Sequence, residues 1–123
     1  MKARVSGIVL VSLLCTAFLV WLPIKAHAHA VMLESRPKAG STVKGPAFDI
    51  WLRFNVRVDG SRSRCTLFLP GGTSETLKLD PQREPAVLTS KASGLSAGTY
   101  KLQWQVLASD GHISRGEFSF NVE

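Results

Sequence analysis

The residues best suited to chemistry in this sequence are its histidines, because the chain has only three. His112 follows Asp110 at a spacing of two, with Gly111 between them. In extended backbone, residues at i and i+2 point to the same side, so the imidazole and the carboxylate are expected to converge, with the glycine permitting a tight bend. Asp-Gly is also a common hairpin signal, so this pattern alone does not require a metal site.

The first part of the chain has the order of a secretory signal peptide. Lys2 and Arg4 precede an uncharged, apolar stretch at 5–24, and residues 26–28 give the Ala-His-Ala pattern that a signal peptidase reads. We therefore expect a signal peptide at 1–28 and export to the periplasm.

Cleavage after Ala28 would make His29 the first residue of a mature domain at 29–123. A terminal histidine offers two nitrogens, the α-amine and the imidazole, and a free amine has a pKa near ~7.7–8.0, so a metal displaces its proton at neutral pH. Two alternatives remain open. The apolar stretch could span a bilayer as an uncleaved anchor, and a cut after Ala30 would remove His29.

Together, His29, Asp110 and His112 would supply three nitrogens and one carboxylate oxygen. That set suits the tetragonal geometry of Cu(II), whereas nickel is a weaker match and zinc prefers tetrahedral sites. Each feature alone has an ordinary explanation, but their conjunction in an exported domain predicts a mononuclear Cu(II) site.

Composition narrows the class of protein. A chain of 123 residues is too short for a large multidomain enzyme, and two cysteines are too few for a disulfide-stapled scaffold or a four-thiolate zinc site. The formal net charge of +6 falls to +3 when the three basic residues before position 29 are removed. The arginines at 53–64 have no glycine-aromatic stacking motif, so we expect no nucleic-acid partner. We also expect no stable membrane insertion after cleavage.

Alternation of apolar and polar residues predicts an all-β domain. Period-two patterns mark strands at 47–54, 99–106 and 117–122, and shorter candidates lie at 31–34, 65–69, 75–79 and 86–92. Turn residues separate them, among them Asp59-Gly60. About seven short strands predict an antiparallel sandwich.

Two further side chains are placed by this alternation. Cys65 alternates with Leu67 and is expected to be a buried, unreactive thiol. Trp51 shares its parity with Asp49 and Arg53, which places it on the outer face of its strand.

Several stretches of the mature chain carry a family resemblance. They are His29 with the following apolar strand, Ser35-Arg36-Pro37 and Gly40, then Leu52-Arg53-Phe54-Asn55, then Leu95-Ser96-Ala97-Gly98-Thr99-Tyr100 through Trp104 to Ser109-Asp110-Gly111-His112, and finally Gly116-Glu117-Phe118-Ser119-Phe120. Together they resemble the CopC family of periplasmic copper-binding proteins, including its YobA-type members, over essentially all of the mature chain.

The resemblance implies a small antiparallel Greek-key β-sandwich or barrel, similar to cupredoxins or immunoglobulin domains, with a Cu(II) site of His29, Asp110 and His112. Some family members carry a methionine-rich loop for Cu(I). Here Met32 is the only methionine after position 28, so a Cu(I) site is not expected. Ile113 stands where the family often has proline, which bears on the loop shape rather than the ligands. A membrane copper importer of the CopD type would be a separate protein.

We therefore expect a periplasmic Cu(II)-binding protein, not an enzyme, that sequesters, buffers or delivers copper. Two other functions stay open. The ligand set also resembles the histidine brace of copper oxygenases, which would make the chain a copper-dependent oxidative enzyme, although its short mature domain leaves little room for a substrate face. The other is a metal-free sandwich module for adhesion or assembly.

Overall fold

The computed structural model describes residues 29–123, and the expected signal peptide at 1–28 lies outside them. Eight strands follow one another in the described part: β1 (Met32–Arg36), β2 (Thr42–Val43), β3 (Phe48–Phe54), β4 (Val58–Phe68), β5 (Ser74–Leu77), β6 (Val87–Ala92), β7 (Gly98–Ala108) and β8 (Ile113–Val122). Over this range there is no helix of the length and apolarity that a membrane crossing needs.

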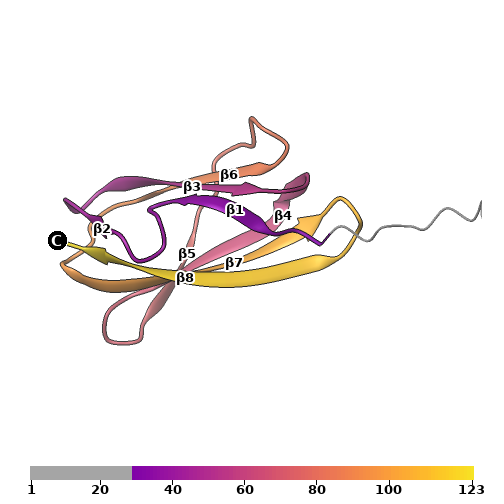
Figure 1. The fold of residues 1–123 in the computed structure, drawn as a ribbon. Coiled ribbons are helices and arrows are strands. Elements are labelled where there is room, and N and C mark those ends of the chain that lie inside the picture. Colours follow the sequence, from indigo (N-terminus) through magenta and orange to yellow (C-terminus); the bar gives the residue numbers. More distant parts are fainter. Residues whose placement is uncertain (1–28) are drawn as a thin grey trace, which may run out of the picture.

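The strands form two sheets that pack face to face (Figure 1). One sheet has three strands in the order β1-β3-β6, and the other has five in the order β2-β8-β7-β4-β5. The all-β sandwich expected from the alternation is confirmed. Pairing is antiparallel except between β2 and β8, which run parallel.

Period-two alternation fills the space between the sheets. From β3, Ile50, Leu52 and Phe54 are buried, and every second residue of β7 from Tyr100 to Ala108 is buried opposite them. Full burial of a large apolar side chain contributes roughly 1.5–3 kcal/mol, so these two strands supply much of the stabilising area. The hydroxyl of Tyr100 donates to the carbonyl oxygen of Ser96 at 2.8 Å, which satisfies its polar end.

The two single residues placed by parity lie as expected. Cys65 is fully buried in β4, and burial raises the pKa of its thiol to about 12. The thiolate is therefore scarce at neutral pH, in line with an unreactive core residue. Trp51 is partly exposed on the outer face of β3, where the guanidinium of Arg36 lies 4.9 Å from its ring centroid.

Two local expectations were wrong. Asp59-Gly60 is not a turn but lies near the start of β4, where the pairing with β7 is irregular between Asp59 and Arg64. Side chains supply the hydrogen bonds there: Asp59 Oδ1 accepts from the N–H of Ser61, and the N–H of Gly60 donates to Gln82 Oε1. The alternation also did not predict β2, because two residues are too few to show an alternating pattern.

Candidate metal centre

The loop between β7 and β8 forms one end of the sandwich (Figure 1). It is closed by two backbone bonds, from the N–H of Ala108 to the carbonyl oxygen of His112 at 2.9 Å and from the N–H of Gly111 to that of Ala108 at 3.0 Å. Gly111 has φ of 84°, in the left-handed region that glycine adopts without strain. The N–H of Ser109 donates to the carbonyl oxygen of Arg57, which ties the loop to the segment before β4.

Asp110 and His112 converge within this loop, but not for the reason expected. The backbone is a tight turn rather than extended, and the N–H of His112 donates to Asp110 Oδ1 at 2.9 Å. Aspartate commonly bonds the backbone two residues on in such turns. The turn brings His112 Nδ1 to 3.3 Å from Asp110 Oδ2, so the two side chains meet as predicted through a different local geometry.

His29 reaches the same end because the residues after it are held by both sheets. The N–H of Ala30 donates to Ser114 Oγ at 3.1 Å, and Ala30 is buried. Asn55 Oδ1, just beyond β3, accepts from the N–H of Val31 at 2.7 Å, and Asn55 Nδ2 donates to the carbonyl oxygen of His29 at 3.3 Å. The segment that leads into β1 is thus held beside β8, and it directs His29 toward the β7–β8 loop.

Sequence reasoning did not assign a role to Asn55 or Ser114. Asn55 was noted only as the last residue of one stretch of the family resemblance, and Ser114 is one of several serines. Their function depends on contacts over 24 to 84 residues of sequence, which a local pattern does not report.

The three predicted ligands lie together. His29 and His112 have ring centroids 5.6 Å apart, with the ring planes at 59°. One donor atom from each of His29, Asp110 and His112 can be chosen so that all three lie within 4.8 Å of one another. Both histidines are exposed, whereas the Asp110 side chain is only 13% exposed, so the cluster is a shallow surface site with its carboxylate set inward.

The surroundings of Asp110 favour the ionised form of its carboxylate. The backbone N–H of His112 is the main cause that lowers the pKa of Asp110 below its ordinary value; burial opposes this, while the His112 side chain and His29 add to it. Oδ1 accepts the backbone N–H of His112, while Oδ2 is buried and lies 3.3 Å from His112 Nδ1. A buried, charged oxygen close to two imidazoles fits a bound cation.

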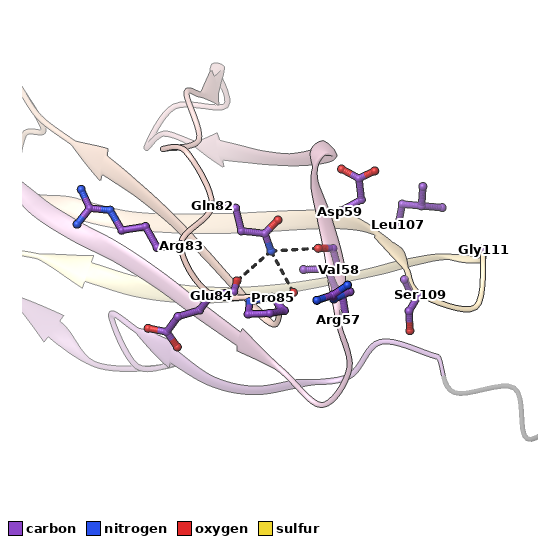
Figure 2. A pocket seen from close by; sticks show the side chains of 11 residues that line it. Arg57, Val58, Asp59, Gln82, Arg83, Glu84, Pro85, Leu107, Ser109 and Gly111 are labelled. Atoms are coloured by element: carbon purple, nitrogen blue, oxygen red, sulfur yellow. Dashed lines mark hydrogen bonds between the residues drawn. The ribbon is translucent and has the colours of Figure 1, made fainter.

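A cavity of about 580 Å³ borders the loop (Figure 2). Its wall is braced by Gln82, whose Nε2 lies 3.0 Å from each of the carbonyl oxygens of Val58, Glu84 and Pro85. Ser109 and Gly111 line it from the loop. The β7–β8 loop therefore lies against a cavity whose wall is held in place by hydrogen bonds.

Fold and site together define a class: a small β-sandwich with a candidate metal centre at one end. Comparison with known proteins identifies the family within this class. The CopC domain model matches residues 32–123, which include Asp110 and His112 and begin just after His29. The chain belongs to the CopC family.

Individual relatives agree with this assignment. Copper resistance protein C of Xanthomonas campestris pv. juglandis is 31% identical over 106 residues, covering 80% of this chain and 83% of that protein. The crystal structure of CopC from Methylosinus trichosporium OB3b matches with a TM-score of 0.72 at 29% identity, covering 77% of this chain and 94% of that one. PcoC, a methionine-rich copper resistance protein from Escherichia coli, matches with a TM-score of 0.65 at 27% identity, covering 78% and 100%.

Proposed function

We propose that this chain is a periplasmic protein that binds one Cu(II) ion through His29, Asp110 and His112 and so sequesters, buffers or delivers copper. The observation that carries the proposal is the convergence of three side chains. One donor atom each from His29, Asp110 and His112 lies within 4.8 Å of the others, and the Asp110 carboxylate is set inward with a lowered pKa. Membership of the CopC family supports copper as the metal.

The donor types support Cu(II) over Cu(I). Imidazole, amine and carboxylate suit Cu(II), whereas Cu(I) selects thioethers and thiolates. Met32 is the only methionine among residues 29–123, and Cys65 is buried in the core. PcoC is described as methionine-rich, and this chain differs from it in that respect.

The fourth donor of the proposed site is the α-amine of His29, which exists only after cleavage at 28. The proposal therefore includes a signal peptide at 1–28 and export to the periplasm. The order of charge, apolar stretch and Ala-His-Ala supports that cleavage. Binding through all four donors would then require the exported form, because the α-nitrogen of His29 is part of a peptide bond before cleavage.

We assign the site to binding and transfer rather than catalysis. Its histidines are exposed, so a partner can reach the ion directly. Three exposed apolar side chains stand close in sequence to proposed ligands, Val31, Leu33 and Ile113. Exposed apolar groups of this kind support contact with a partner protein, which we propose is a separate membrane copper transporter of the CopD type.

The test is a titration of the exported protein, with its N-terminus determined by mass spectrometry. We expect tight one-to-one binding of Cu(II) at neutral pH, with weaker binding of nickel and zinc. A chain that begins at His29 and fails to bind Cu(II) tightly would overturn the proposal. Oxygen-dependent turnover of the copper-loaded protein with a reductant would instead support the oxidative-enzyme alternative.

A further inference from the structure

The outer face of the five-stranded sheet carries a row of polar side chains that the copper site does not use. Arg64 of β4 is paired in register with Gln105 of β7, and Gln105 is paired with Arg115 of β8. Neighbouring strands lie about 4.8 Å apart, so the two arginines start about 10 Å apart with the glutamine between them. The long side chains of Arg64 and Arg115 can therefore both reach over Gln105.

These side chains present donors rather than acceptors. Arg115 Nε donates to Gln105 Oε1 at 3.0 Å, which occupies the acceptor of the amide and leaves its Nε2 and the terminal nitrogens of Arg115 as donors. A cavity of about 210 Å³ lies here, lined by Arg64, Thr66, Gln103, Trp104, Gln105 and Arg115. No aspartate or glutamate lines it.

The positive charge of the row is not compensated within the described chain. Two other arginines have acidic partners: Arg53 of the three-stranded sheet pairs with Glu34, and Arg62 of β4 pairs with Asp59. Within residues 29–123, neither Arg64 nor Arg115 forms an ion pair.

The nearest acid in the sheet does not supply the missing partner. Glu117 stands in the next row, opposite Gln103, and pairs with Lys101 at 3.4 Å. The side chains of Arg64 and Arg115 start about 10 Å apart, which is close to the Debye length of about 8 Å at physiological salt, so their charges repel each other until an anion lies between them.

We propose that this cavity binds an oxyanion of the phosphate class, with Arg64 and Arg115 as charged ligands and Gln105 and Thr66 as neutral donors. Guanidinium groups match the oxygens of phosphate with paired hydrogen bonds, and two arginines with no lining carboxylate favour an anion over a cation. Free inorganic phosphate and the phosphate of an anionic phospholipid headgroup share this chemistry. The proposal involves none of the copper ligands.

The first experiment measures thermal stability without copper. Inorganic phosphate is titrated into the purified protein at constant ionic strength, with chloride as the balancing anion. A ligand that binds only the folded state at about five times its Kd should raise the Tm of a domain of this size by about 4–8 °C. The double variant Arg64→Gln, Arg115→Gln should lose this rise. The control Arg57→Gln, an exposed arginine that lines a different cavity with Asp59 and Glu84, should keep it.

The second experiment separates the two sources of phosphate. Vesicles of equal parts phosphatidylglycerol and phosphatidylcholine, and vesicles of phosphatidylcholine alone, are sedimented with wild type and with the double variant. Binding to the anionic vesicles that the double variant loses assigns the site to lipid headgroups, while a Tm rise with inorganic phosphate alone assigns it to the free anion. If the double variant behaves as wild type with both probes, the proposal is wrong. The double variant without phosphate should melt close to wild type, because both arginines are exposed and the one hydrogen bond lost, from Arg115 to Gln105, lies on the surface.

Discussion

Asp110 and His112 contact each other twice, through the backbone N–H of His112 at 2.9 Å from Oδ1 and through Nδ1 at 3.3 Å from Oδ2. The two carboxylate oxygens therefore have different tasks. Oδ1 shapes the turn, and Oδ2 faces the His112 imidazole at the proposed metal site. This division makes it possible to separate folding of the loop from metal binding by mutation.

Asp110→Asn should weaken Cu(II) binding by roughly 10–100-fold while leaving the loop intact. The amide oxygen can still accept from the N–H of His112, but the charge and one ligand oxygen are lost. Asp110→Ala should weaken Cu(II) binding as much. It should also lower the free energy of unfolding, because the hydrogen bond from the N–H of His112 to Oδ1 is lost. Competition titrations against a chelator of known affinity, with thermal melts, measure both effects. Asp49→Asn, on the outer face of the other sheet, is the control. Equal copper affinity in wild type and Asp110→Asn would remove Asp110 from the site.

Acetylation of the α-amine of His29 should strongly weaken Cu(II) binding without changing the fold. The acetyl group converts the amine into an amide, and the two-nitrogen chelate is lost. Circular dichroism should be unchanged, since His29 itself is exposed. Unaltered affinity in the acetylated protein would show that the amine is not a ligand.

Asn55→Ala should lower copper affinity although Asn55 is not a proposed ligand. Its side chain bonds the N–H of Val31 and the carbonyl oxygen of His29, so its removal loosens the segment that positions His29. We expect roughly a 10-fold loss, comparable to the removal of a group that orients a metal ligand. Asn121→Ala is the matched control, because that asparagine bonds Thr99 on β7. Equal losses in both variants would mean a general loss of stability rather than positioning.

Copper affinity should fall as the pH drops from 7 to 5, by about tenfold per pH unit for each proton displaced from nitrogen ligands. Asp110 should not contribute in this window, since its lowered pKa keeps it ionised throughout. The pH slope of Asp110→Asn should therefore equal that of wild type, offset to lower affinity. A shallower slope in the variant would show that Asp110 titrates there. Its stabilising charge should be lost only as the pH falls below about 4.

Gly116→Ala should lower the free energy of unfolding by about 1–3 kcal/mol, the usual cost of overpacking. A Cβ at this position would overlap the Trp104 ring, which lies directly over the glycine. Denaturant unfolding followed by tryptophan fluorescence measures the change, and Ser119→Ala on the exposed face of β8 is the control. An unchanged free energy of unfolding would mean that the indole moves aside at no cost.

The alternating pattern predicted the strands that carry a full buried face, because burial on one side leaves a signal every second residue. β2 and the irregular start of β4 left no such signal: β2 is two residues long, and the start of β4 relies on Gln82, more than twenty positions away, for its hydrogen bonds. The three candidate ligands were identifiable by residue type and spacing. Their approach depends on Asn55 and Ser114, which act across the fold and were not predicted.

The hydrogen bond from Ala30 to Ser114 spans 84 residues of sequence. In an unfolded chain, the entropy of closing so long a loop opposes the meeting of His29 with the Asp110–His112 turn. The three ligands therefore come together only in the folded protein. An ion bound by all three would in turn stabilise the folded state. Retention of the metal would then distinguish correctly folded molecules from misfolded ones in the compartment where the chain matures.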